Sequence, residues 1–147
     1  MRVALDTNVL AYAEGINGAA KKQEALRLIQ QLPANAAHLP VQTLGELFQL
    51  LVRKAKRSAT QARAAILGWR DAFPVIETSE TVMVAAVELA ASHPLGIWDA
   101  VILASAAEGD CRLLLTEDLQ EGFTWNGVTV TNPFAKLPHP LLRQLLS

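Results

Sequence analysis

The stretch from Arg2 to Leu10, RVALDTNVL, constrains the fold of this chain more than any other. It begins as a short apolar strand, continues directly into Asp6, and then offers Thr7 and Asn8 as residues that start a helix. A carboxylate at the end of a buried parallel strand points into the crevice where open α/β folds bind their ligands. We therefore interpret Asp6 as the centre of a functional site.

The composition favours one ordinary domain, which we expect to comprise residues 1–147. A chain of 147 residues, 51% of them hydrophobic, can bury about two thirds of its unfolded surface without disulfides. No apolar run approaches the ~20 residues that span a bilayer, and Asp6 and Asn8 interrupt the run that a signal peptide would need. We expect a cytoplasmic protein with no membrane partner. A net charge of −1 gives no overall attraction for nucleic acid.

Periodicity and turn residues predict alternating strands and helices. Amphipathic helices are predicted over 19–32, 41–53, 58–71, 80–92 and 96–108, and further strands over 37–39, 75–76, 111–116 and 127–130. Strands separated by helices predict a three-layer α/β/α sandwich with a mostly parallel sheet of about five strands. We expect the strand 127–130 at an edge. Residues 135–147 are expected to form a C-terminal tail or short helix, packed on its own domain or in a homodimer contact.

Several acidic residues are candidate partners for Asp6. They are Glu46, Asp99 and the pair Glu117-Asp118. Two carboxylates about 4 Å apart repel by roughly 4 kcal/mol at an effective dielectric constant near 20, so a cluster of them needs protons or a cation. Because all the ligands are oxygens, the expected cation is a hard one, Mg²⁺ or Mn²⁺.

Each acid also has a purely structural explanation. Asp99 lies in a first helical turn, where a carboxylate stabilises the helix dipole, and Asp6 and Asp118 can cap short helices or turns. Glu46 falls on the helix face opposite the apolar stripe, so its spacing alone predicts a solvated side chain. Only the joint placement of these acids favours a site.

Their order and flanking residues resemble the PIN-domain ribonucleases, in particular the VapC-type toxins of bacterial toxin–antitoxin pairs. The matching segments are LDTNVL at 5–10, LGEL at 44–47, WDAVILA at 98–104, LLTED at 114–118 and VTNPF at 130–134. They span almost the whole chain. The resemblance implies that the α/β/α sandwich is PIN-like.

The resemblance also implies a role for each acid. In that family, acids at four matching positions form the catalytic metal site: Asp6, Glu46, Asp99 and Asp118. Asp6, Asp99 and Asp118 would hold one or two Mg²⁺ or Mn²⁺ ions, with Glu46 binding through water or orienting the attacking water. Glu117 departs from the family, which has a variable and often polar or basic residue there. Asp118 completes the Thr-x-Asp pattern and is the expected ligand.

Neighbouring polar residues are candidates for hydrogen bonds that hold these carboxylates in place. They are Thr7, Asn8, Thr116 and Glu117. Thr116 matches a position that supplies a hydroxyl in the family. Helix capping explains Thr7 and Asn8 equally well.

The activity that the resemblance implies is metal-dependent endoribonuclease cleavage, leaving 5′-phosphate and 3′-hydroxyl ends. No side-chain nucleophile is required, because a metal-activated water attacks the phosphodiester. RNA is then the substrate, a cognate antitoxin is the expected protein partner, and we expect a homodimer.

A basic run is the candidate surface for the RNA backbone. It consists of Arg53, Lys54, Lys56 and Arg57. Such residues bind phosphates without regard to sequence. The alternative is a solvated surface with no ligand.

Other acid-pocket proteins fit less well. A signalling receiver module needs paired acids at the end of its first strand, where Leu5 precedes Asp6. A phosphatase with an aspartyl nucleophile needs a second acid where Asn8 stands. The remaining alternative is a catalytically inactive PIN-like scaffold that binds RNA or a protein partner.

Overall fold

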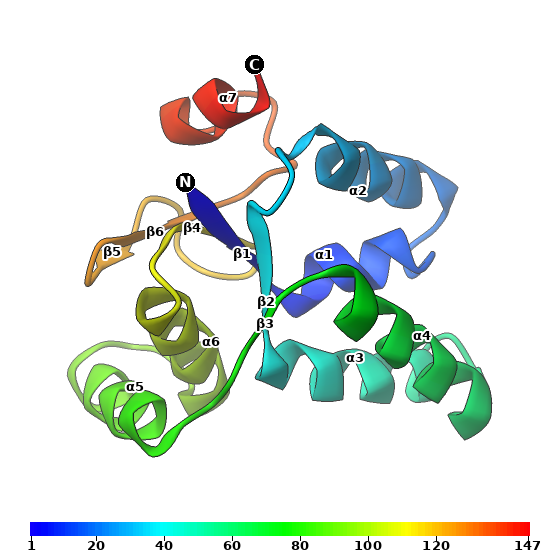
Figure 1. Ribbon diagram of the computed structural model, residues 1–147, viewed down its shortest axis with the longest axis horizontal. Coiled ribbons are helices and arrows are strands. Elements are labelled where there is room, and N and C mark those ends of the chain that lie inside the picture. The colour runs from blue at the N-terminus through cyan, green and yellow to red at the C-terminus, as the bar shows by residue number, and fades with distance from the viewer.

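The computed structural model describes residues 1–147 and shows helices on both faces of a central sheet (Figure 1). The elements, in chain order, are β1 (Arg2–Leu5), α1 (Thr7–Ala13), α2 (Ala19–Gln31), β2 (Ala37–Pro40), α3 (Val41–Arg53), α4 (Ala59–Ala72), β3 (Val75–Ile76), α5 (Glu80–Ser92), α6 (Ile97–Glu108), β4 (Cys111–Leu115), β5 (Thr124–Trp125), β6 (Val128–Thr131) and α7 (Pro140–Leu146). This order confirms the predicted α/β/α sandwich. None of the helices combines the length and apolarity needed to cross a membrane.

The strands form one sheet in the order β3-β2-β1-β4-β6-β5. Every neighbouring pair is parallel except β5 and β6, which form an antiparallel hairpin. Asn126 and Gly127 join them with positive φ angles of 46° and 83°, as a tight hairpin turn requires. The sheet therefore has six strands rather than about five. The prediction that the strand near 127–130 lies at an edge is wrong, because β5 covers that side of β6.

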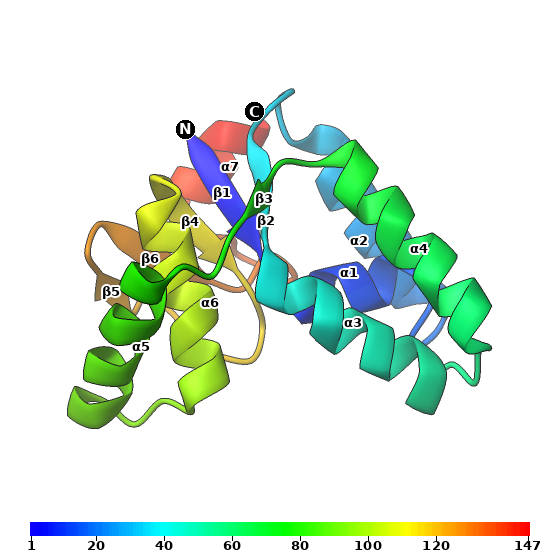
Figure 2. The same ribbon diagram turned by 60° about the horizontal axis from the view of Figure 1, so that its bottom comes forward.

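Alternate residues of the central strands serve two separate cores. Val3 and Leu5 pack with α1, α2, α3, α4 and α7 on one face, whereas Ala4 and Leu114 pack with α5 and α6 on the other. The two groups of helices flank the strands in Figure 2. Because both faces of β1 and β4 are covered, residues 3–5 and 113–115 form continuous apolar runs, and only Arg2 and Arg112 interrupt the two strands.

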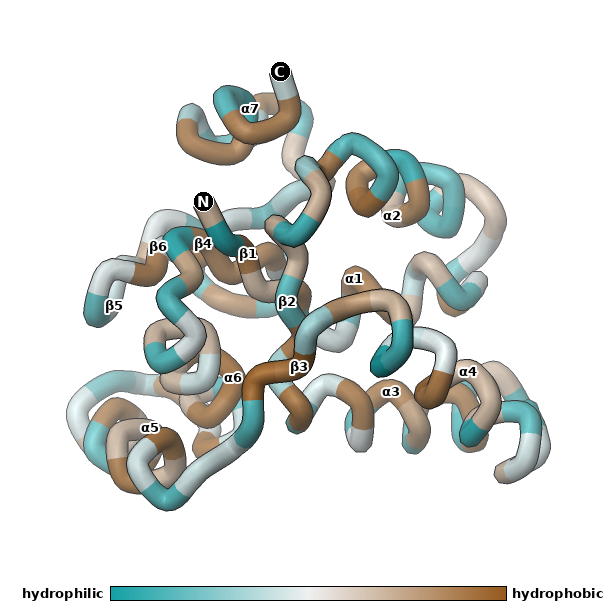
Figure 3. Tube along the Cα trace, in the orientation of Figure 1, coloured by the Kyte–Doolittle hydropathy of each residue, from teal (hydrophilic) through white to brown (hydrophobic).

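The C-terminal helix α7 packs on its own domain. Leu142 is fully buried, and Leu141, Leu145 and Leu146 pack against the same core. Figure 3 shows the apolar side of α7 turned towards the rest of the chain. These leucines are therefore used inside the fold, and the homodimer stays a prediction.

The strand order places the site. β2 pairs with one side of β1, and β4 pairs with the other side. The direction in which strands are added to the sheet therefore reverses between β1 and β4, which makes this a topological switch point. Leu5 is paired with Leu115, and the backbone N–H of Asp6 donates to the carbonyl oxygen of Leu115 at 3.0 Å. Asp6 and the segment that begins at Thr116 therefore leave the same edge of the sheet side by side, where such folds bind ligands.

Candidate active site

Asp6 is the buried centre of the acidic cluster. Only 5% of its surface is exposed, and its Oδ1 accepts a hydrogen bond from the backbone N–H of Thr7 at 2.7 Å. Asp6 is thus the N-cap of α1, and the prediction that Thr7 or Asn8 caps this helix is wrong. Burial raises the pKa of Asp6 to about 6, and the negative charges of Asp99 and Asp118 add to this increase.

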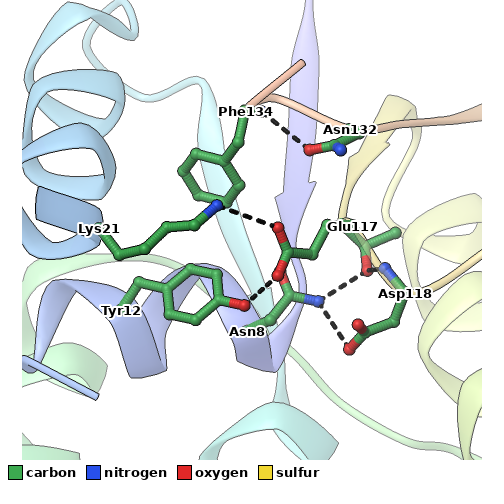
Figure 4. A network of polar contacts seen from close by, with 8 residues as sticks. Asn8, Tyr12, Lys21, Glu117, Asp118, Asn132 and Phe134 are labelled. Atoms are coloured by element: carbon green, nitrogen blue, oxygen red, sulfur yellow. Dashed lines mark hydrogen bonds and ion pairs between the residues drawn. The ribbon is translucent and has the colours of Figure 1, made fainter. Parts of the chain in front are cut away.

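Asn8 and Thr116 hold Asp118 in place beside the cluster. Figure 4 shows the Asn8 amide directed at the Asp118 carboxylate. The Asn8 side-chain amide donates to Asp118 Oδ2 at 3.0 Å and to Thr116 Oγ1 at 2.8 Å. The hydroxyl oxygen of Thr116 also accepts from the backbone N–H of Asp118 at 3.1 Å. Two of the four predicted supporting residues therefore contact the carboxylate or the backbone of Asp118.

Helices α3 and α6 contribute the remaining acids. Glu46, on α3, accepts a hydrogen bond from the Thr7 hydroxyl at 3.1 Å and is half-buried, so the solvated position predicted from its spacing alone is wrong. Its pKa is raised by burial and then by the charge of Asp6. Asp99, in the first turn of α6, has a pKa raised by burial and by the charge of Asp118. The four predicted acids therefore lie within reach of one another's electric fields.

Glu117 points away from this cluster, although it is the sequence neighbour of Asp118. Its carboxylate accepts a hydrogen bond from the Tyr12 hydroxyl and forms an ion pair with Lys21 Nζ at 3.3 Å (Figure 4). The Lys21 ammonium also lies 5.1 Å and 4.6 Å from the ring centroids of Tyr12 and Phe134. Glu117 thus ties the loop after β4 to α1 and α2, and the geometry favours Asp118 as the acid of the cluster.

Tyr12 and Lys21 are partners that the sequence analysis missed. Burial and the Glu117 carboxylate raise the pKa of Tyr12 to about 12, so its hydroxyl keeps the proton that it donates. One local signal pointed to Tyr12, since it lies four residues after Asn8 and hence on the same face of α1. Lys21 has no such signal, because α2 meets the loop only in the folded chain.

Three of the four acids line two hollows that share Asp118 as a wall, whereas Asp6 is buried and lines neither. The larger hollow, of about 570 Å³, contains Glu46 and ends at Arg53 and Lys54. The smaller hollow, of about 220 Å³, contains Asp99. Two residues of the predicted basic run therefore lie beside the acids.

The other two basic residues do not approach the acids in the same way. Arg57 forms an ion pair with Glu14, with 2.7 Å between Nη1 and Oε1, and its Nη2 donates to the Glu14 carbonyl oxygen at 2.8 Å. Trp69 Nε1 donates to the second carboxyl oxygen of Glu14 at 2.8 Å. Arg57 is thereby engaged within the fold. Lys56 is exposed and lines neither hollow.

A family model for the PIN domain matches residues 3–121. The chain belongs to the PIN-domain family. This family assignment confirms the resemblance noted in the sequence, and the matched range contains all four acids. Proteins with PIN domains are generally nucleases that use divalent metal ions. No curated protein sequence matches this PIN domain.

Solved structures share its fold. VapC20 from Mycobacterium tuberculosis, a toxin that cleaves the sarcin-ricin loop, is 20% identical, with a TM-score of 0.66 over 79% of this chain and 89% of that one. A toxin–antitoxin complex from Klebsiella pneumoniae is 23% identical, with a TM-score of 0.67 over 90% and 98%. VapBC2 from Rickettsia felis, bound to a promoter DNA fragment, is 18% identical, with a TM-score of 0.65 over 90% and 98%.

The acids of this PIN domain fit a hard divalent cation in number and chemistry. The chain has three ion pairs, and none of them includes Asp6, Glu46, Asp99 or Asp118. The side-chain oxygen Oδ1 of Asn8 is also buried beside them without a hydrogen-bond donor. No three His, Cys, Asp or Glu side chains are close enough to hold a metal ion as they stand. Mutual repulsion keeps like charges apart, and a cation would offset it.

Proposed function

We propose that this PIN domain is an Mg²⁺- or Mn²⁺-dependent endoribonuclease. The observation that carries the proposal is a group of four acids near the topological switch point, none of which is paired with a Lys or Arg. Burial and the charges of neighbouring acids raise the pKa of three of them, Asp6, Glu46 and Asp99. Leaving such charges uncompensated is costly for a fold, which is why perturbed carboxylates mark functional sites. Family membership supports the same activity.

Each acid has a distinct task in this proposal. Asp6, Asp99 and Asp118 are the metal ligands, and the ion, when bound, supplies an activated water and offsets charge on the phosphodiester. Glu46, held by the Thr7 hydroxyl, has a raised pKa and so is suited to orient that water and accept its proton. Asn8 and Thr116 keep Asp118 turned towards the site.

We further propose that the chain is the toxin of a toxin–antitoxin pair, acts in the cytoplasm as a homodimer, and is held inactive by an antitoxin. Support comes from the shared fold, since the similar structures include complexes of such pairs from Klebsiella pneumoniae and Rickettsia felis. Expression of the chain alone, and together with the product of any small reading frame next to its own gene, tests this role. A growth defect that the second gene relieves is the expected result, and no defect under any level of expression contradicts it.

Cleavage of a labelled single-stranded RNA tests the nuclease proposal. The wild type should cut with Mg²⁺ or Mn²⁺ and stop in EDTA, and Asp6→Asn should abolish cutting. Asp71→Asn is the matched control, because Asp71 is exposed on α4 and pairs only with its neighbour Arg70. Metal-dependent cleavage that survives in Asp6→Asn would contradict the proposed site.

The second candidate function is a scaffold that binds RNA or a protein without cutting. The observation that favours it is that no three carboxylates are at metal-binding separation as they stand. RNA binding with no cleavage in Mg²⁺ or Mn²⁺, by a protein shown to be folded, would select this alternative.

A further inference from the structure

The smaller hollow differs in chemistry from the larger one. His93, Phe123 and Gln120 are among its lining residues, and no Lys or Arg lines it. The larger hollow instead ends at Arg53 and Lys54. Asp118 separates the two, so a chain that crosses the acids has a basic surface on one side and an aromatic one on the other.

The aromatic wall is built by two loops that come from different parts of the fold. His93 follows α5, and Phe123 precedes β5, yet their rings pack edge to face with centroids 5.2 Å apart. Asp99 and Asp118 line the same hollow. No Lys or Arg lines this hollow, so a phosphate there would depend wholly on the cation proposed for the acids, and the rest of the lining is better suited to an uncharged group.

A planar, uncharged ring suits these walls. Single-stranded RNA is recognised by stacking its unpaired bases on Phe and His rings and by hydrogen bonds to the base edges. Gln120 is exposed at this wall, and its amide can both donate and accept. A volume of about 220 Å³ is below the range typical of drug-sized ligands and suits a single base.

We propose that the hollow between His93, Phe123 and Gln120 binds the base of one nucleotide adjacent to the scissile phosphate, while Arg53 and Lys54 hold the backbone on the other side of Asp118. This subsite rests on the proposed nuclease function for its place beside the cut. It makes His93, Phe123 and Gln120 binding residues that govern which phosphodiester is presented to the acids.

The test combines removal of a base with removal of the rings. A 5′-labelled single-stranded RNA that the wild type cuts is synthesised with one abasic ribonucleotide, moved position by position past the cleavage site. For the wild type, one position next to the cut should lower kcat/KM roughly tenfold, the loss expected for one stacked base. In the double variant His93→Ala/Phe123→Leu this penalty should fall below about twofold, because the abasic RNA and the variant lack the same contact.

Phe48→Leu is the matched control, because Phe48 is an exposed aromatic residue on α3 that lines neither hollow. It should keep the full abasic penalty. Gln120→Ala guards against a folding defect, since this exposed side chain can be removed while both rings stay in place, and it should reduce the same penalty. An abasic penalty unchanged in the double variant and in Gln120→Ala, or the absence of any sensitive position, overturns the subsite.

Failure of the nuclease proposal gives a different result. If the wild type cuts no RNA, fluorescence anisotropy measures binding of the same labelled oligonucleotides instead. A single abasic position that weakens binding to the wild type but not to the double variant supports the base site without cleavage. Equal binding of all the oligonucleotides overturns it.

Discussion

The chain treats two sets of carboxylates in opposite ways. Glu14 and Glu117 each have a cation and a hydrogen-bond donor from other elements. Arg57 pairs with Glu14 and Trp69 donates to it. Lys21 pairs with Glu117 and Tyr12 donates to it. Asp6, in contrast, is almost fully buried with three further acids nearby and no cation of the protein. The first set joins helices to loops and strengthens the fold. The second set keeps a negative charge that only a ligand can offset.

The contrast is sharpest at two adjacent residues. Glu117 and Asp118 have the same charge and lie on one loop, but they have different partners (Figure 4). Glu117 contacts Tyr12 and Lys21, whereas Asp118 contacts Asn8. Glu117 contacts a basic group and a hydroxyl group and has a structural role. Asp118 lies near other acids and belongs to the candidate site. A group of like charges without a cation destabilises a fold, and natural proteins keep such groups mainly where function requires them.

The largest expected effect is a difference in kcat between variants of Asp118 and variants of Glu117. Asp118→Asn should reduce kcat by on the order of a thousandfold, since it removes a proposed metal ligand charge. Glu117→Gln keeps the shape and the Tyr12 contact while weakening the Lys21 ion pair, so its loss should stay within about tenfold to a hundredfold. Single-turnover cleavage of one labelled RNA measures both. A larger loss for Glu117→Gln than for Asp118→Asn would reverse the assignment of the two acids.

The next effect concerns stability without metal. Because the pKa of Asp6 is raised from 3.8 to about 6, the folded state binds its proton more tightly than the unfolded state does. The contribution of Asp6 to the stability of the EDTA-treated wild type should therefore be greatest below about pH 4 and be lost as the pH rises through about 6. Asp6→Asn removes this loss and should stabilise the protein at pH 7.5 by up to about 3 kcal/mol, with little gain at pH 4.

Urea denaturation in EDTA at both pH values measures this difference. Asn is as good an N-cap as Asp, so the contact with the backbone of Thr7 is retained. Asp71→Asn is again the control and should change nothing at either pH. An Asp6→Asn protein that is less stable than the wild type at pH 7.5 would show that the buried charge is compensated within the chain.

A divalent cation should act on the second set of carboxylates alone. Binding to the folded state stabilises it by about 2.7 kcal/mol at a free concentration of 100 times Kd. Mg²⁺ or Mn²⁺ should therefore raise the Tm of the wild type, and this shift should vanish in Asp6→Asn but persist in Glu14→Gln. An equal shift in all three proteins would assign the cation to some other part of the surface.

Most of the fold could be predicted from local sequence, whereas the roles of the charged residues could not. Helices over 41–53 and 80–92 agree with α3 and α5 because apolar periodicity and capping residues are local signals. The strand β5 has only two residues, Thr124 and Trp125, and exists through its pairing with β6, so its one local signal is the Asn126-Gly127 turn between them. The apolar alternation also could not reveal that β5 covers the expected edge.

The charged residues show why spacing is not enough. Glu46 lies opposite the apolar stripe of its helix, yet the Thr7 hydroxyl at the start of α1 covers it. Arg57 belongs to a basic run, yet Glu14 from the end of α1 engages it. The positions of Glu46 and Arg57 thus depend on contacts with residues about 40 positions away in the sequence. A helical wheel shows only the residues of one helix and cannot predict such contacts. The order of the four acids along the chain, by contrast, is a property of the sequence itself and could be recognised there.

The smallest expected effect concerns the basic run, which, like the carboxylates, contains both ligand-facing and structural residues. Arg53 and Lys54 line the hollow beside the acids, so Arg53→Ala/Lys54→Ala should weaken RNA binding and reduce the slope of log Kd against log salt by up to about 1.4, or 0.7 for each lost phosphate contact. Arg57→Ala should leave that slope nearly unchanged and instead destabilise the fold, because Glu14 loses its cation. Anisotropy titrations at several salt concentrations, with a urea melt of each variant, separate the two outcomes. If Arg57→Ala lowered the salt slope as much as the double variant does, all three residues would belong to one RNA-binding surface. Arg57 would then be a ligand-facing residue and not a structural one.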